Sequence, residues 1–341
     1  MGELLFGVFD HVDRGPQPLD EYYEQRLKLV EAYDAAGFYS YHVAEHHSTP
    51  LGMAPSPGIF FGAVAQRTRR LRFGPMVYLL PLYHPIRLTE EIAMLDQLSH
   101  GRYDPGIGRG ISPIESTLYG RDPSIAQELF DEMLAIMKMG LGSGKVDFEG
   151  KHYQFHDVSI EVRPKQTPYP PFWYGINSVE SAERCVERDF NAITLIPNPA
   201  VNDVCRRYLA AAQAAGKTSL KMGISRFVVV AETDAEALAI ARRAYPVWHE
   251  NFHYLYHAYG RSPVHGERPI EYEGMIALGL AIAGSPETVT AALRAQLAGT
   301  GANYVVSQFA FGDTTLEESL RSTALFAGKV MPALRRELVT A

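Results

Sequence analysis

Apolar segments of strand length alternate with segments of helical spacing along the whole chain. The first unit joins an apolar run at residues 4–9 to a helix at about residues 20–36, which carries Leu27 and Val30 on one face and ends at Gly37. Eight such units, with no break in composition between them, predict an α/β fold in which a single domain at residues 1–341 forms a (β/α)8 TIM barrel rather than an open sheet. Strands are expected at residues 4–9, 39–44, 71–80, 103–108, 172–176, 192–196, 223–230 and 304–309. Helices are expected at residues 20–36, 59–67, 85–101, 125–141, 178–188, 202–215 and 234–244, from Ser285 onward, and at 316–338.

Two segments depart from this alternation. Residues 147–163 carry aromatic and β-branched side chains around Glu149-Gly150, which predicts a small hairpin added to the barrel. Residues 245–272, after the seventh strand, are read as a long irregular loop, and loops of that length usually serve a function. We expect this loop to wall the site and exclude water through the aromatic residues Trp248, Phe252, Tyr254 and Tyr256.

Composition and charge exclude several classes of protein. The 341 residues are 46% hydrophobic and 21% charged with a net charge of -7, which argues against nucleic-acid binding. The two cysteines, Cys185 and Cys205, lie in predicted helices, so a disulfide framework is not expected and the cytoplasm is the expected location. The most apolar run, residues 275–283, is too short to span a membrane, and no export signal is expected at the start of the chain.

The triplet Glu45-His46-His47 follows the second predicted strand, at the end of a barrel where catalytic groups gather. A histidine there can act as a general base or as a hydrogen-bond donor. A pair of structural histidines is the plainer alternative. Metal ligation is disfavoured because neighbouring residues on an extended strand point in opposite directions.

Two glycine-containing segments are candidate anion sites. Gly106-Ile107-Gly108-Arg109-Gly110 follows the fourth strand; it fails the dinucleotide-binding spacing, but Arg109 supplies a fork of donors suited to a phosphate. Gly175-Ile176-Asn177-Ser178 opens a helix that contains Ser181, and free amides at a helix start stabilise anions. A tight turn with a surface arginine and a simple Ser178 N-cap remain the alternatives.

Taken together, these motifs resemble the bacterial-luciferase-like monooxygenase family in order and spacing. The resemblance covers nearly the whole chain and is least at residues 245–272. It is carried by Val43-Ala44-Glu45-His46-His47, His84-Pro85-Ile86-Arg87, Leu95-Asp96-Gln97-Leu98-Ser99-His100-Gly101-Arg102, Gly108-Arg109-Gly110, Glu183, Glu187-Arg188, Gly284-Ser285-Pro286-Glu287 and Met331-Pro332-Ala333-Leu334.

The resemblance implies a barrel that binds reduced FMN at the carboxyl ends of its strands. It places His46 beside the flavin ring as the catalytic residue, with Glu45 counted in the same catalytic pair. Met76-Val77 matches a non-proline cis peptide under the ring. The remaining cofactor-binding residues that it implies are Arg109, Ile111, Gly175, Asn177, Ser178 and Ser181.

Three departures separate the chain from luciferase itself. Gly108 stands in place of a reactive cysteine, Gln127 in place of a second phosphate-binding arginine, and Asn177 in place of an acidic residue. Light emission is therefore not expected. Arg121 is a candidate for the missing positive charge.

The resemblance implies a monooxygenase in which reduced FMN, supplied by a transiently bound reductase, reacts with O2 and oxygenates a small organic substrate through a peroxyflavin. It implies a homodimer, and no metal is expected. Three alternatives stay open: a deazaflavin-dependent hydride-transfer enzyme, a non-catalytic flavin-binding subunit and a metal-dependent hydrolase barrel.

Overall fold

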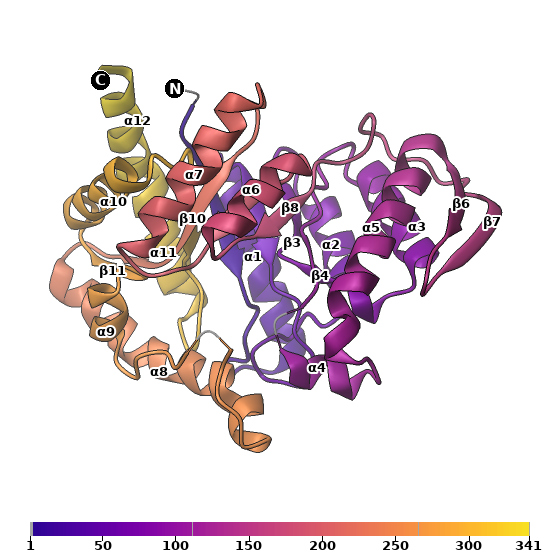
Figure 1. The fold of residues 1–341 in the computed structure, drawn as a ribbon. Coiled ribbons are helices and arrows are strands. Elements are labelled where there is room, and N and C mark those ends of the chain that lie inside the picture. The colour runs from indigo at the N-terminus through magenta and orange to yellow at the C-terminus, as the bar shows by residue number, and fades with distance from the viewer. Residues whose placement is uncertain (1–2, 111, 265, 341) are drawn as a thin grey trace.

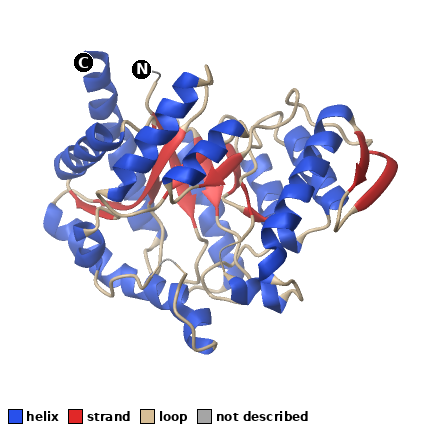
Figure 2. Ribbon diagram, in the orientation of Figure 1, coloured by secondary structure: helices blue, strands red, loops and turns tan. Residues whose placement is uncertain are grey.

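A curled sheet of parallel strands forms the centre of the molecule (Figures 1 and 2). The computed structural model describes residues 3–110, 112–264 and 266–340. Each strand pairs in parallel with its neighbours, as expected when strand and helix alternate. Along the sheet the order is β3 (Arg72–Pro75), β2 (Ser40–Val43), β1 (Leu5–Asp10), β12 (Tyr304–Gln308), β10 (Met222–Val230), β9 (Asn191–Thr194) and β8 (Trp173–Gly175).

One segment hydrogen-bonds to both edges of this curled sheet. Tyr103 bridges to Phe73 of β3, and Gly106 bridges to Trp173 of β8. Within the same segment β5 (Ile107–Gly108) pairs with the short strand β4 (Tyr78–Leu79). The expected strand at residues 71–80 is therefore two short strands, β3 and β4, and the peptide bond between Met76 and Val77, which separates them, is cis.

Helices cover the outer face of the sheet, as Figures 1 and 2 show. Within the described residues, none of them combines the length and apolarity needed to cross a membrane. Their bounds are α1 Leu19–Ala36, α2 Pro57–Arg67, α3 Pro85–Leu98, α4 Pro113–Leu118, α5 Ala126–Ser143, α6 Val179–Glu187, α7 Ala200–Ala214, α8 Asp234–Ala258, α9 Tyr272–Ala277, α10 Pro286–Thr300, α11 Leu316–Leu325 and α12 Met331–Thr340.

The expected hairpin insertion is present. Strand β6 (Lys145–Glu149) pairs antiparallel with β7 (Gln154–Ser159) at one side of the molecule, beside α3 and α5 (Figure 1).

The prediction of an irregular loop at residues 245–272 is wrong. Helix α8 continues without interruption to Ala258, and only residues 259–271, apart from the undescribed residue 265, are irregular before α9. The apolar face of the helix carries on past Ala244 through Trp248 and Leu255. Pro246 lies inside the helix, but on its exposed side, where water can hydrogen-bond to the carbonyl group that loses its amide partner.

A ninth strand was also missed. Strand β11 (Ala281–Gly284) pairs in parallel with the second half of β10, outside the main path of the sheet. The apolar run at residues 275–283 covers the end of α9 and the start of β11, and no strand was predicted within it.

Candidate active site

The candidate residues of the sequence come together at the carboxyl ends of the strands. Glu45, His46 and His47 follow β2, while Arg109 follows β5. Since all the strands of the curled sheet are parallel, these positions lie at one end of it.

His46 is held by a carboxylate that the sequence analysis missed. Its Nδ1 lies 3.3 Å from Oε1 of Glu115 on α4, and the same oxygen accepts the backbone N–H of His47 at 2.7 Å. Burial alone would raise the pKa of Glu115, but the charge and hydrogen bond of His46 outweigh it and the pKa lies below the ordinary value of 4.5. An ionised carboxylate only accepts, so Nδ1 carries a proton whether His46 is charged or neutral, and in the neutral ring Nε2 is the nitrogen that can accept a proton.

Glu45 lies in a separate network beside His46. Its Oε1 accepts from Nε2 of His47 at 2.8 Å, and its Oε2 accepts from the Tyr83 hydroxyl at 2.9 Å and from the Leu79 amide at 3.2 Å. Tyr119 extends this hydrogen-bond network, because its hydroxyl lies 2.7 Å from Nδ1 of His47. Burial raises the pKa of Glu45. These contacts make Glu45 a residue that positions His47 and ties β2 to β4.

A second histidine, His11, stacks on His46 and was not anticipated. It follows β1, and the two imidazole rings lie 6.0 Å apart with an interplanar angle of 18°. Its Nδ1 accepts from Nε1 of Trp248 at 3.3 Å, and the Gln308 side chain hydrogen-bonds to the same ring. Burial and the nearby His46 lower the pKa of His11, so this ring stays neutral.

The cis peptide is enclosed by glycines. A Cβ on Gly108 would lie 2.5 Å from Cγ2 of Val77, and one on Gly106 would lie 2.3 Å from the carbonyl oxygen of Pro75. A Cβ on Gly175, at the end of β8, would lie 3.8 Å from the terminal methyl of Met76. The glycines at positions 106 and 108 are therefore explained by close packing against the chain on either side of the cis bond.

Three arginines lie near Tyr174, which follows the start of β8. The charges of Arg109, Arg188 and Arg184 all act to lower the pKa of Tyr174, although burial raises it overall. Arg109 itself is exposed. Arg188 and Arg184, at the end of α6, therefore bring further guanidinium groups near this point. The charge of Arg121, the candidate named from the sequence, acts to lower the pKa of Tyr153 in the hairpin, which burial raises overall.

Ser178 is the N-cap of α6, as its plainer interpretation predicted. Ser178 and Ser181 form a capping box, in which Ser178 Oγ accepts the amide of Ser181 at 3.2 Å and Ser181 Oγ accepts the amide of Ser178 at 3.0 Å. The amide of Asn177 also donates to Ser181 Oγ. The Glu180 carboxylate accepts its own amide and the Ser178 hydroxyl, which lowers its pKa. An anion bound here would compete with Glu180. Ile111, also expected to bind the cofactor, lies outside the described residues.

Helix α8 forms one wall of the site. Trp248 packs on His11, with ring centroids 5.5 Å apart, and Phe252 stacks on Trp248 at 5.2 Å. Tyr256 is buried against Ile114 of α4, which lies at the same end of the molecule as the second half of α8 (Figure 1). Tyr254 differs from the expectation, because half of its surface is exposed. The wall comes from a helix instead of an irregular loop.

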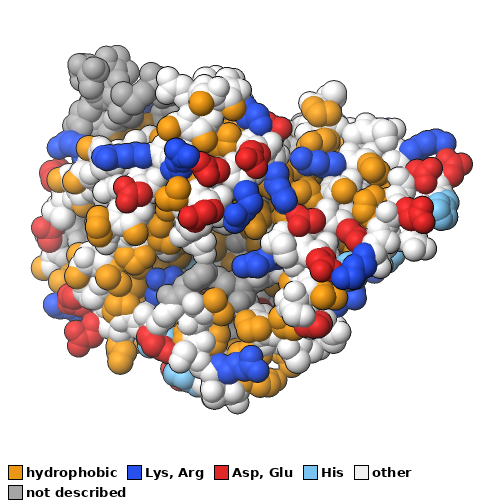
Figure 3. Space-filling model, in the orientation of Figure 1, with side chains coloured by type: hydrophobic (Ala, Val, Ile, Leu, Met, Phe, Trp, Pro, Cys, Tyr) orange, Lys and Arg blue, Asp and Glu red, His pale blue; other side chains and the backbone are white. Residues whose placement is uncertain are grey.

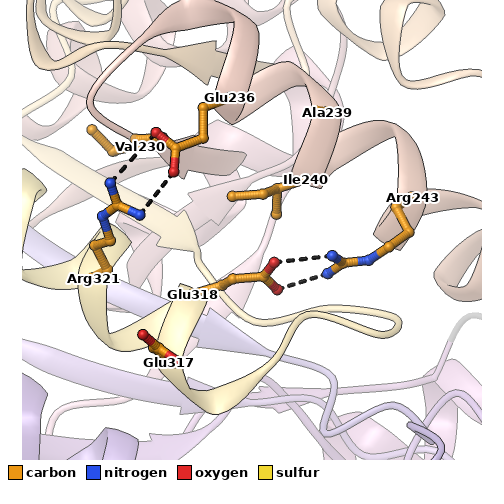
Figure 4. Close-up of a pocket in the computed structure, with 9 residues that line it drawn as sticks. Val230, Glu236, Ala239, Ile240, Arg243, Glu317, Glu318 and Arg321 are labelled. Carbon is orange, nitrogen blue, oxygen red and sulfur yellow. Dashed lines mark hydrogen bonds and ion pairs between the residues drawn. The ribbon is translucent and has the colours of Figure 1, made fainter.

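A surface pocket of about 330 Å³ lies elsewhere, between α8 and α11 (Figure 4). Its floor is apolar at Val230 and Ile240, and its rim pairs Arg321 with Glu236 and Arg243 with Glu318. No candidate residue of the sequence lines it. The face drawn in Figure 3 shows basic and acidic side chains interspersed over the surface, without one extended basic patch.

Fold and site together define an α/β protein whose curled parallel sheet gathers histidines and a cis peptide at the carboxyl ends of its strands. The chain belongs to the luciferase-like monooxygenase family, whose family model matches residues 4–304.

Relatives support an oxidoreductase function. Uncharacterized protein y4wF of Sinorhizobium fredii is 38% identical over 332 residues, which cover 96% of this chain and 97% of that protein. The oxygenase component of flavin-dependent trigonelline monooxygenase from Acinetobacter baylyi is 30% identical over 192 residues, covering 55% of this chain and 53% of the relative.

Two solved structures match the whole fold. Monooxygenase RslO1 from Streptomyces bottropensis is 27% identical with a TM-score of 0.86, and the match covers 96% of this chain and 99% of that one. The oxygenating constituent of 3,6-diketocamphane monooxygenase from Pseudomonas putida, solved in complex with FMN, is 24% identical with a TM-score of 0.80, over 97% of this chain and 99% of that one. The likeness to the second shows the fold alone.

Proposed function

We propose that the chain is a single-domain (β/α)8-barrel monooxygenase that uses reduced FMN and O2 to oxygenate a small organic substrate. The observation that carries the proposal is the His46–Glu115 pair, which lies at the same strand ends as the cis Met76–Val77 bond and Arg109. Family membership and the relatives named as monooxygenases agree with it.

The residues present fit such a cofactor. Arg109 is exposed, and the hydroxyls of Ser178 and Ser181 stand at a helix start, so these groups would hold the phosphate. Met76, Val77 and Gly175 would face the flavin ring. When bound, reduced FMN supplies the electrons that activate O2.

The chain's own groups handle protons and water. His46 is fixed through Nδ1 by Glu115, so its free Nε2 can take up a proton and return it to the reacting groups. His11 stays neutral and keeps the Trp248 ring in place through its Nδ1. Trp248 and Phe252 exclude water from that side of the site.

The proposed partners are a separate flavin reductase and a second copy of the chain. Two relatives are named as the oxygenase or oxygenating part of a larger system. Large apolar side chains are exposed on α2 and α3, at Ile59 (79%), Met94 (51%) and Leu98 (43%). An exposed apolar face of this kind supports the proposed homodimer.

The test is oxygen-18 incorporation. Purified protein is mixed with reduced FMN, ¹⁸O2 and a panel of aldehydes, ketones and small organic carboxylates, and the products are examined by mass spectrometry. We expect one labelled oxygen in a product, and we expect His46→Ala to lower its rate by roughly 10²-fold while FMN still binds. His156→Ala, which changes an exposed histidine of the hairpin, is the matched control and should change nothing.

The other outcomes separate the alternatives. Oxidation of a reduced deazaflavin without oxygen uptake would favour hydride transfer. Structures of F420-dependent enzymes share the fold at 16 to 18% identity, which shows the fold alone. FMN binding without any turnover would favour a non-catalytic subunit.

A further inference from the structure

Arg268 is a half-buried arginine in the irregular segment between α8 and α9. Its backbone carbonyl lies 3.0 Å from Nε2 of His249, which fixes the segment against α8. Its guanidinium lies over the ring of Phe252, 5.9 Å from the centroid. The side chain therefore extends along the aromatic wall of the site.

The positive charge of Arg268 affects a buried residue of the site, His11. Phe252 stacks on Trp248, which donates its indole N–H to His11. The Arg268 charge contributes to lowering the pKa of His11, so the guanidinium and this imidazole are electrostatic neighbours. Arg268 is thus linked to His46 through the neighbouring rings of Phe252, Trp248 and His11.

No carboxylate in the described part of the chain pairs with Arg268. The adjacent Glu267 carboxylate instead lies 2.8 Å from Nε2 of the buried His253. Burial lowers the pKa of Arg268, and only the Tyr245 phenol opposes that shift. Holding a cation in a half-buried place without a counter-ion costs free energy that an anion would offset.

We propose that Arg268 recognises the anionic group of the substrate, a small organic carboxylate whose apolar body lies against Phe252, beneath which Trp248 is buried. This rests on the proposed function, because it assigns the substrate class of the same site. A guanidinium presents a planar fork of donors that matches the two oxygens of a carboxylate. The aromatic rings beside it supply an apolar surface for the rest of the molecule.

The experiment compares benzoate with benzamide, which has the same ring without the charge. Trp248 is one of only two tryptophans in the chain, so its fluorescence reports on this wall during a titration of the protein. We expect benzoate to bind at least tenfold more tightly than benzamide. Arg268→Gln should abolish that preference and leave benzamide binding unchanged. Arg261→Gln, at an exposed arginine of the same segment, is the matched control and should keep the preference.

Two results would overturn the proposal: equal affinity for both probes, or a benzoate preference that survives in Arg268→Gln. Should Arg268→Gln fail to fold, Arg268→Lys is used in its place, because it keeps the charge. We expect Arg268→Lys to retain part of the benzoate preference. A full tenfold preference that persists in this variant at 1 M salt would contradict an ionic contact. Reduced-FMN affinity is measured in the same variants. A loss there would assign Arg268 to the cofactor and overturn the proposal. Because the titration needs no turnover, absence of oxygenation would refute the proposed function without affecting this result.

Discussion

Asp13 should make the stability of the protein fall as the pH rises from about 4 to about 6. Asp13 is fully buried after β1, where its Oδ2 accepts from the amide of Gly312 at 2.9 Å and from Nδ2 of Asn251 at 3.2 Å. It thereby joins the first loop of the site to α8 and to the loop after β12. Within the described residues, its Oδ1 has no hydrogen-bond partner. Burial raises the pKa of Asp13 from 3.8 to about 6, although the charge of Arg26 opposes the shift.

The magnitude follows from proton linkage. Between pH 3.8 and about 6, the folded protein keeps a proton on Asp13 that the unfolded chain has released. The neutral carboxyl favours the folded state below this window, and ionisation removes that advantage above it. With about 1.4 kcal/mol for each pH unit, the total is about 3 kcal/mol.

The assay is urea unfolding of the wild type and of Asp13→Asn at several pH values from 4 to 8. Asparagine keeps the shape and an accepting oxygen but cannot ionise. Relative to the wild type, the variant should gain about 3 kcal/mol of unfolding free energy between pH 4 and pH 8. A difference that stays constant over this range would refute the reasoning, because it would mean that Asp13 ionises without a penalty.

Asp34 provides a control, because its effect on the stability should change with pH in the opposite direction. It accepts the backbone amides of Arg69, Arg70 and Leu71, and its pKa lies below the ordinary value, because these hydrogen bonds outweigh the effect of its partial burial. Its contribution is present above pH 3.8 and is lost as the pH falls through its folded-state pKa. Asp34→Asn should therefore lose stability relative to the wild type as the pH rises toward 3.8, and the difference between the two should stay nearly constant above that pH.

Two further predictions concern the proposed flavin site. Arg109→Ala should weaken the binding of reduced FMN by about 1.5 to 3 kcal/mol, measured by anaerobic titration, because a charge-assisted hydrogen bond is lost; an unchanged affinity would place the phosphate elsewhere. Glu115→Gln should lower turnover roughly tenfold and shift the pH–rate profile to lower pH, because the neutral amide no longer stabilises the protonated His46 ring; Glu115→Asp should restore part of the rate, and an unmoved profile would make Glu115 purely structural.

Most of the sheet could be predicted from the sequence because buried parallel strands leave a clear apolar signal. Strand β1 begins and ends within one residue of the predicted range, and the starts of α1 and α10 agree with the predicted ones to within about one residue. Helix α8 was expected to end at residue 244 because the aromatic residues that follow were read as an irregular stretch, whereas the structure continues the helix to Ala258, with Pro246 on its exposed side.

The site shows where local sequence signals stop being informative. Ser112 and Glu115 have the spacing of a capping box, and Ser112 Oγ does accept the amide of Glu115, so the pattern correctly marks the start of α4. In an isolated helix the Glu115 carboxylate would return to the amide of Ser112. Here it turns to His46 and to the amide of His47 instead. The backbone amide of Glu115 therefore follows the capping-box pattern, whereas its side chain does not. The loop after β2 lies close enough to offer the carboxylate other partners, and this tertiary contact cannot be read from the local sequence.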